Sequence, residues 1–193
     1  MNRSDKVREN LIKSARQMFA RFGFEKTTMN EIAIEARKGK SSLYYYFTSK
    51  EEVFQAVVEY EADMLREKLA AAFREPENLL DKMRNYIVVR FNEIIKLGNL
   101  YQALRNDFLN HLEFVQKARL KYDKLELEFF TLVLKQGCEN GVFTIENPEH
   151  VAKTFHLTIK AVELPLLISY EQEVFEKQLN TIIDIVFFGL VKR

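Results

Sequence analysis

The sequence is short of cysteine, glycine and proline, and this shortage narrows the fold class. Its 193 residues include one cysteine, no tryptophan, six glycines and three prolines. A single cysteine, Cys138, excludes an internal disulfide and a cysteine-rich zinc site. A fold rich in β-strands needs more glycine and proline for its turns. The composition therefore favours long helices joined by short connections, and no metal site is expected.

Long apolar runs are also missing. The run at 185–191 is among the longest, and it falls far short of the roughly 20 residues needed to cross a bilayer. The first residues, Met1 to Lys6, lead into a charged helix and not into the apolar stretch of a signal peptide. We therefore expect a cytoplasmic protein with no membrane partner.

Motifs of common enzyme classes are absent as well. The sequence contains neither a G-x-G-x-x-G nor a Walker loop. It has no Glu-x-x-His pair for a di-iron helical bundle, and its three histidines are dispersed. These absences predict that the chain is not an enzyme and binds no cofactor.

Charge is distributed unevenly along the chain. Residues 1–50 carry 11 Lys and Arg against 5 Asp and Glu, whereas residues 51–193 carry 18 against 23. A basic first quarter on a mildly acidic remainder indicates two functions in one chain. The basic part is a candidate for binding a polyanion, and nucleic acid is the first choice.

Apolar residues recur at helical spacing throughout the chain. The pattern predicts an all-α protein of about nine helices, with a three-helix helix-turn-helix headpiece followed by a larger C-terminal helical bundle. Two domains are expected, at 1–50 and at 51–193; the residue patterns described below predict DNA binding for the first and ligand binding and dimerisation for the second. Two short helices are expected, one from the cap at Thr28 to before Gly39 and one that carries Leu43 and Phe47. The other expected helices cover about 4–22, 49–73, 79–97, 100–107, 111–136, 148–170 and 174–190.

The segment 27–50 carries the functional signal. Thr28 and Glu31 have the spacing of a capping box, as do Ser49 and Glu52, so each pair predicts a helix start. Two short helices between longer ones cannot be stable alone and must pack as a unit. That arrangement is a helix-turn-helix.

The second short helix presents small hydroxyls, tyrosines and lysines on the faces that Leu43 and Phe47 do not use. The hydroxyls allow close approach to base edges, and the longer side chains reach phosphates. These candidate DNA contacts are Lys38, Lys40, Ser41, Ser42, Tyr44, Tyr45 and, at the start of the next helix, Lys50. A surface helix with a solvated basic turn is the alternative interpretation.

Several runs in this segment closely resemble the DNA-binding region of the TetR family of one-component transcriptional regulators. They are FARFGF at 19–24, TTMNEIA at 27–33, KSSLYYYF at 40–47 and SKEEVF at 49–54. The resemblance covers about residues 7–55 without a gap, and beyond them it is limited to helical layout. It implies an all-helical homodimer that binds double-stranded operator DNA through two headpieces and responds to a small-molecule effector.

The resemblance also implies roles for single residues. Thr27 and Thr28 would hold a phosphate, Ser41 and Ser42 would face bases, Tyr44 and Tyr45 would contact the backbone and groove wall, and Lys40 and Lys50 would bind phosphates. The chain departs from the family in the turn, where Arg37 replaces the usual glycine and Lys38 a customarily apolar residue. Because a left-handed conformation is costly for arginine, we expect the left-handed position to move to Gly39.

Twelve of the sixteen phenylalanines follow Phe47. Most must be core, but a largely apolar ligand cavity between helices is the functional interpretation. Candidate lining residues are Tyr86, Arg90, Phe91, Phe108, His111, Tyr122, Phe129 and Phe155.

The last two predicted helices have wide apolar faces that a soluble monomer would not expose. Pairing with a second copy would cover them, and the resemblance places the dimer contact in the same helices. The expected interface residues are Val151, Phe155, Thr158, Ile159, Val162, Leu179, Ile183, Val186, Phe187 and Leu190.

These observations together predict a dimeric, sequence-specific DNA-binding transcriptional regulator, a repressor released by a small, largely apolar ligand. Two alternatives remain open. One is a helical carrier of apolar ligands that does not bind DNA, and the other is a protein-interaction module that uses the basic headpiece on an acidic partner.

Overall fold

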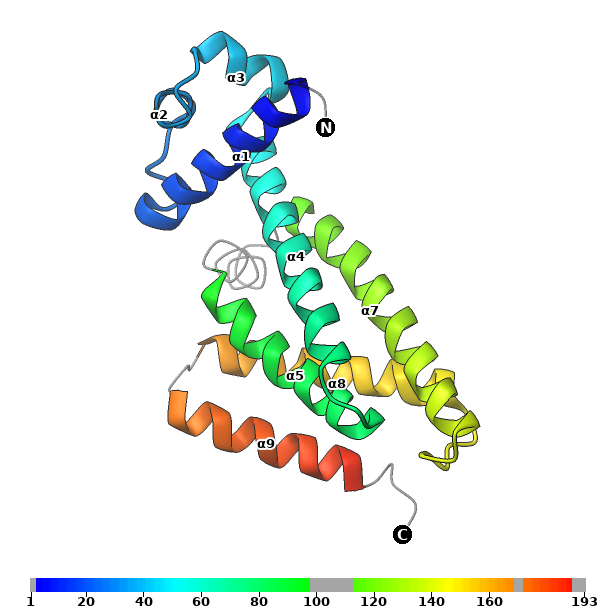
Figure 1. Cartoon of the computed structure of the whole chain (residues 1–193). Helices are drawn as coiled ribbons and strands as arrows, with labels where there is room; N and C mark the ends of the chain where they lie inside the picture. The colour runs from blue at the N-terminus through cyan, green and yellow to red at the C-terminus, as the bar shows by residue number, and fades with distance from the viewer. Residues whose placement is uncertain (1–2, 98–112, 169–171, 189–193) are drawn as a thin grey trace. The chain divides into compact units, whose positions relative to one another are not determined.

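The computed structural model describes residues 3–97, 113–168 and 172–188, and its regular elements in these ranges are all α-helices (Figure 1). This confirms the all-α prediction. Eight helices lie in the described ranges, and the short helix expected at 100–107 falls outside them. The helices are α1 (Arg3–Phe22), α2 (Met29–Glu35), α3 (Lys40–Tyr46), α4 (Lys50–Arg74), α5 (Leu79–Lys96), α7 (Glu113–Glu139), α8 (Pro148–Ile168) and α9 (Gln172–Phe188).

The described residues form two compact units. The first lies within Met1–Met64 and Leu97–Ala118, and the second within Leu65–Lys96 and Arg119–Arg193. Helix α4 is continuous from Lys50 to Arg74, so its first part belongs to one unit and its last part to the other.

The first unit is held together by side chains that α1, α2, α3 and α4 all contribute. Helices α2 and α3 have seven residues each, too few to be stable without packing. Each therefore buries an apolar side chain against its neighbours, Ile32 from α2 and Leu43 from α3. The largest fully or almost fully buried side chains of this unit are Leu11, Ile32, Leu43, Phe47, Val53, Val57 and Glu61.

An ion pair and an aromatic cluster join α1 to α4 within this unit. The guanidinium Nε of Arg16 donates to Oε1 of the buried Glu61 at 2.7 Å. Phe19 packs edge-on against Phe54 with ring centroids 5.1 Å apart, and Phe24 contacts both rings. These contacts fix the entry of α4 beneath the helix-turn-helix.

The second unit has an aromatic-rich core between α5, α7, α8 and α9. Phe130 of α7 lies at its centre and contacts Tyr86 of α5 and Phe155 of α8. The buried members are Leu69, Met83, Tyr86, Ile87, Phe91, Phe130, Val133, Leu134, Phe143, Ala152, Phe155, Ile159, Leu179, Ile183 and Phe187.

No described helix combines the length and the apolar character required to span a bilayer.

Candidate nucleic-acid interface

Helix α2 begins with the capping box that the sequence predicted. The Thr28 hydroxyl accepts a hydrogen bond from the Glu31 N–H at 3.3 Å, and the Thr28 N–H donates to Glu31 Oε2 at 2.8 Å. Hydrogen bonds from the hydroxyl and N–H of Thr28 lower the pKa of Glu31. The cap fixes where α2 starts, and the exposed Thr28 lies at that start.

The turn between α2 and α3 corrects one prediction. Arg37 adopts the left-handed conformation with φ of 53°, whereas Gly39 has φ of −71°. The Arg37 N–H donates to the Ile34 carbonyl at 2.9 Å, and the Lys38 N–H donates to Ala33 at 2.9 Å. This pair of bonds is a Schellman motif, which requires its left-handed residue two positions after the last helical residue. Hydrogen bonding therefore places the strain on Arg37 even though a glycine follows nearby.

The end of α2 is also tied to α1. Asn10 Nδ2 donates to the Ala36 carbonyl at 3.1 Å. Because this carbonyl lies directly before the left-handed Arg37, the bond from α1 fixes the turn that aims α3.

Helix α3 separates a buried face from an exposed one, as predicted. Leu43 is fully buried, and Phe47, the residue that ends the helix, is almost fully buried. On the other faces Ser41 and Lys40 are exposed and Ser42 is half-buried. Tyr44 and Tyr45 are 44% and 80% exposed.

Three positively charged residues lie in the turn and at the start of this helix. Arg37, Lys38 and Lys40 are all exposed. The Lys40 ammonium lies 5.7 Å from the centre of the Tyr44 ring, one helical turn away, in a cation–π contact. The surface therefore combines cations, hydroxyls and aromatic rings, the side chains that contact phosphates and base edges.

Two of the predicted phosphate contacts have other roles in the structure. Thr27 is 1% exposed, and its hydroxyl donates to the Gly23 carbonyl at 2.8 Å, so its side chain does not reach the surface. The Lys50 ammonium donates to the Phe24 carbonyl at 2.9 Å and lies 4.3 Å from the Phe24 ring centre. Both side chains fix the segment between α1 and α2, and the Thr27 hydroxyl is buried in doing so.

The start of α4 follows the predicted cap only in part. The Ser49 hydroxyl accepts from the Glu52 N–H at 3.2 Å, as a capping box requires. The Glu52 carboxylate accepts instead from the N–H and the hydroxyl of Thr48, at 2.6 and 2.9 Å. These two bonds lower the pKa of Glu52, and they extend the cap by one residue toward α3.

Two short helices, a hydrogen-bonded turn and an exposed basic face thus form a helix-turn-helix. The sequence model of the family described as "Bacterial regulatory proteins, tetR family" matches residues 11–57, which cover this motif. The helix-turn-helix of this chain is that of the TetR family of transcriptional regulators. The resemblance noted in the sequence is confirmed.

Relatives outside the motif extend this assignment. The HTH-type transcriptional regulator QacR of Staphylococcus aureus is 26% identical over 200 residues, with all of both chains covered. The HTH-type transcriptional repressor NicS of Pseudomonas putida is 30% identical over 110 residues, or 52% of each chain. Both are named as regulators, in agreement with the prediction that this TetR-family chain is not an enzyme.

A solved structure supports the fold over almost the whole chain. A transcriptional regulator from Cytophaga hutchinsonii is 25% identical and superimposes with a TM-score of 0.82, over 95% of this chain and 98% of that one. The similarity therefore includes the second unit, where sequence alone gave only a helical layout.

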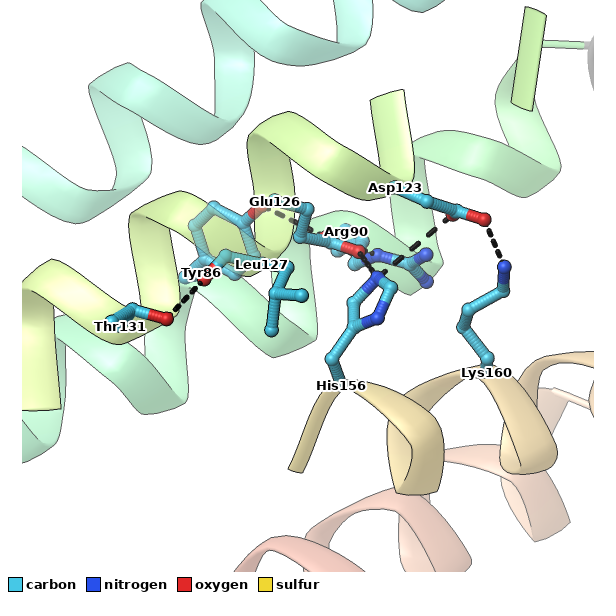
Figure 2. A network of polar contacts seen from close by, with 8 residues as sticks. All are labelled: Tyr86, Arg90, Asp123, Glu126, Leu127, Thr131, His156 and Lys160. Atoms are coloured by element: carbon cyan, nitrogen blue, oxygen red, sulfur yellow. Dashed lines mark hydrogen bonds and ion pairs between the residues drawn. The ribbon is translucent and has the colours of Figure 1, made fainter. Parts of the chain in front are cut away.

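The predicted ligand residues of the second unit separate into two groups. Tyr86 and Arg90 of α5 belong to a buried polar cluster with Glu126 of α7 and His156 of α8 (Figure 2). Glu126 Oε1 accepts from the Tyr86 hydroxyl at 2.9 Å and from Arg90 Nε at 2.8 Å, and its Oε2 lies 3.2 Å from His156 Nε2. Asp123 of α7 extends the cluster through an ion pair with Lys160 of α8.

Glu126 is the centre of this cluster, and the sequence analysis did not single it out. Burial acts to raise the pKa of Glu126, but the charge of Arg90 and hydrogen bonds from His156, Arg90 and Tyr86 outweigh it and lower the pKa to about 2. Glu126 follows Tyr122 by four residues and precedes Phe129 by three, so it lies on the inward stripe of α7. A charged residue on such a stripe is the signal that could have identified it.

The aromatic candidates pack differently. Phe129 stacks on the Tyr86 ring at 4.9 Å and meets Phe73 edge-on at 4.9 Å. Phe91 and Phe155 line a small apolar cavity of about 20 Å³ between α5, α8 and α9. Ligand pockets for drug-sized molecules are far larger. Tyr122 is half-buried, and Phe108 and His111 lie outside the described residues.

The predicted dimer residues require a correction. Phe155, Ile159, Leu179, Ile183 and Phe187 are buried within the same chain. Val151, Val162 and Val186 are partly buried against the same core, Thr158 is half-buried, and Leu190 lies outside the described residues. A helical pattern shows that a face is buried but not which chain buries it, so these predictions mixed the core with the outer surface.

Other apolar residues of α8 and α9 face outward. Leu157 of α8 and Ile185 of α9 are both 68% exposed. They lie beside partly buried positions of the two helices, among them Val186.

Proposed function

We propose that this TetR-family regulator is a homodimer that binds a specific operator in double-stranded DNA, represses transcription from it, and is released by a small, largely apolar ligand. Its target implies that it acts in the cytoplasm, where bacterial DNA is located. The observation that supports the proposal most strongly is the exposed face of α3, which carries Ser41, Tyr44 and Tyr45 opposite the buried Leu43 and Phe47.

Individual roles follow from position and chemistry. Ser41 and Ser42 are short hydroxyl side chains at the start of α3 and would approach base edges closely. Tyr44 and Tyr45 would contact the groove wall and the sugar–phosphate backbone. Thr28, Lys38 and Lys40 would bind phosphates, and the exposed Arg37 adds a further charge. Phosphate contacts raise affinity without selecting sequence.

Dimerisation would give two α3 helices in one particle. A symmetric pair of recognition helices must meet half-sites separated by about one turn of DNA, ~34 Å, or a multiple of it. We propose that the second copy packs on the outer faces of α8 and α9, covering Leu157 and Ile185.

Release by a ligand requires that the ligand prefer the state that does not bind DNA. A 100-fold preference corresponds to about 2.7 kcal/mol. We propose that the ligand binds among the apolar residues of the second unit and enlarges the cavity lined by Phe91 and Phe155. Helix α4, which belongs to both units, would transmit the change as a tilt.

Selection of bound fragments from a random DNA pool, repeated at several salt concentrations, tests the proposal. We expect one sequence pattern with two-fold symmetry to be enriched above a salt-sensitive background. Enrichment of no sequence would reject the proposal. Binding of apolar ligands with no DNA binding would favour a carrier, and binding of an acidic protein alone would favour an interaction module.

Two substitutions on opposite faces of α3 give a second test. Tyr44→Ala should weaken operator binding without unfolding the protein, because Tyr44 is exposed. Phe47→Ala should destabilise the first unit by roughly 3–5 kcal/mol, because it removes a buried ring. Urea denaturation and fluorescence anisotropy with labelled operator separate the two effects. Equal loss of stability in both variants would contradict the assignment of the faces.

A further inference from the structure

The most exposed ring of α3 has a neighbour that restrains it. Tyr45 is 80% exposed, yet its ring meets the ring of Tyr46 edge-on, with centroids 4.9 Å apart and an interplanar angle of 88°. Aromatic rings favour this edge-to-face geometry because the positive edge of one faces the negative face of the other. The contact therefore favours one orientation of an otherwise solvated side chain.

Tyr46 is itself held by α1. Its hydroxyl lies 2.9 Å from the Ser4 hydroxyl, a hydrogen bond between residues 42 positions apart in the chain. Ser4 belongs to the first turn of α1, which lies beside α3 (Figure 1). The bond fixes the Tyr46 ring at its far end, and so it fixes the surface on which Tyr45 rests.

This chain of contacts is not needed to hold α1 against the helix-turn-helix. The fully buried Leu11 and the almost fully buried Phe47 already join the two, and Asn10 donates to the Ala36 carbonyl at 3.1 Å. Ser4 and Tyr46 are only half-buried at the edge of the unit. A hydroxyl pair in such a place adds little to stability.

We propose that Ser4 and Tyr46 are positioning residues that hold the Tyr45 ring in the orientation in which it contacts DNA. A free side chain must be ordered when a complex forms, and that ordering weakens binding. A ring restrained beforehand avoids most of this loss. The proposal rests on the proposed DNA-binding role of α3.

A double-mutant cycle on the full-length protein tests the proposal. The probe is the operator recovered by selection with the unmodified protein, and the measurement is its dissociation constant. Ser4→Ala should weaken binding about threefold to tenfold, and it should have no further effect in the Tyr45→Ala background. The free energy of unfolding, measured by urea denaturation, should differ little between the variants.

Graded substitutions distinguish the hydroxyl from the ring. Tyr46→Phe keeps the edge contact and loses the hydrogen bond, so it should match Ser4→Ala, whereas Tyr46→Leu should weaken binding more. Ser4→Thr retains a hydroxyl and should bind like the unmodified protein. Tyr60→Phe, the same chemical change in α4 of the same unit, is the control and should leave binding unchanged.

Three results would overturn the inference. If Ser4→Ala weakens operator binding equally in the unmodified protein and in the Tyr45→Ala variant, Ser4 acts through the general stability of the headpiece. Unchanged binding by Ser4→Ala would mean that Tyr45 needs no such restraint. If the unmodified protein selects no DNA sequence, the proposed function itself fails, and the inference fails with it.

Discussion

Arg37 adopts the left-handed conformation that its position in the turn requires, and this conformation costs free energy. An L-residue in the left-handed region is disfavoured by roughly 1–2 kcal/mol relative to its usual conformations, and glycine avoids this. Arg37→Gly should therefore raise the free energy of unfolding by about 1 kcal/mol. It should also weaken binding to nonspecific DNA, because an exposed positive charge is lost. Urea denaturation and salt-dependent binding measure the two effects.

Two controls separate strain from charge. Arg37→Ala removes the charge but keeps a Cβ in the left-handed region, so it should weaken DNA binding without a gain in stability. Lys38→Gly removes a neighbouring charge where φ is not left-handed, and it should not stabilise. A gain in stability for Lys38→Gly equal to that for Arg37→Gly would show that charge repulsion, and not backbone strain, is the cause.

Glu126 links stability to pH through its low pKa. A carboxyl whose folded pKa lies below its unfolded value contributes stability above the unfolded pKa, and this contribution is lost as pH falls through the folded pKa. With a folded pKa of about 2 and an ordinary value of 4.5, the loss should occur between pH 4.5 and 2. Its size should be roughly 3 kcal/mol. Unfolding midpoints measured across this range test the expectation.

Substitution isolates the contribution of Glu126 from that of the other carboxyls. Glu126→Gln should be less stable than the unmodified protein at pH 7, because it leaves the charge of the buried Arg90 without its carboxylate. Its stability should then fall less steeply between pH 4.5 and 2. Glu128→Gln, an exposed position on the same helix, is the matched control. The same acid profile in all three proteins would refute the assignment.

At the scale of the element, the end of α7 depends on one glycine. A Cβ at Gly137 would overlap the Phe143 ring and lie 2.9 Å from Leu79 Cδ2. The Gly137 carbonyl also accepts from the N–H groups of Val142 and Phe143, at 2.8 and 3.1 Å. The chain after α7 therefore folds back directly over Gly137. The Phe143 ring that covers this glycine also belongs to the core of the second unit.

Gly137→Ala should consequently be destabilising. Alanine favours a helix over glycine by about 1 kcal/mol, but overpacking a core costs roughly 1–3 kcal/mol, so we expect a net loss in the unfolding free energy. Gly141→Ala is the comparison, because Gly141 has φ of 70° and open space around a Cβ, and it should lose only about 1 kcal/mol from backbone strain. A stabilised Gly137→Ala variant would show that Phe143 moves aside without cost.

At the scale of the whole molecule, the proposed dimer depends on the outer faces of α8 and α9. Leu157→Asp and Ile185→Asp should each weaken the proposed dimer by more than about tenfold, because a carboxylate would be buried without a partner. Sedimentation velocity over a range of concentrations measures the effect. Operator binding should weaken in parallel, since two headpieces bind together.

Leu132→Asp provides the control. Leu132 lies on α7 and is 68% exposed, as Leu157 and Ile185 are, but it does not belong to the proposed contact. Its substitution should leave the dimer intact. If all three variants remain dimeric, the second copy contacts another surface.

Local patterns predicted the elements of the first unit well. The cap formed by Thr28 and Glu31, the burial of Leu43 and Phe47 and the exposure of Tyr44 and Tyr45 all follow from residues within a few positions of one another. Such features depend on hydrogen bonds to the nearest N–H groups and on the 3.6-residue period. Both can be read along the chain.

Predictions that depended on distant partners were less accurate. Thr27 was expected to bind a phosphate through its side chain, but that side chain is buried and its hydroxyl donates to Gly23. The phosphate contact of Lys50 stays a prediction, and its bond to Phe24, 26 residues away, was not predicted. Gly39 was expected to carry the left-handed conformation, but the hydrogen bonds of the turn place it on Arg37. A polar side chain that is satisfied inside the fold looks the same in sequence as one that is free for a ligand.

The sequence by itself determined the helices, the separation of charge and the motif that matches the TetR family, because each is encoded by neighbouring residues. Only the tertiary structure decided which apolar faces of α8 and α9 are core, that Glu126 joins Tyr86, Arg90 and His156, and that Ser4 meets Tyr46. These pairings join residues 30 to 42 positions apart. They form only when packing brings the helices together, because a charged or polar side chain that is buried without a partner costs free energy.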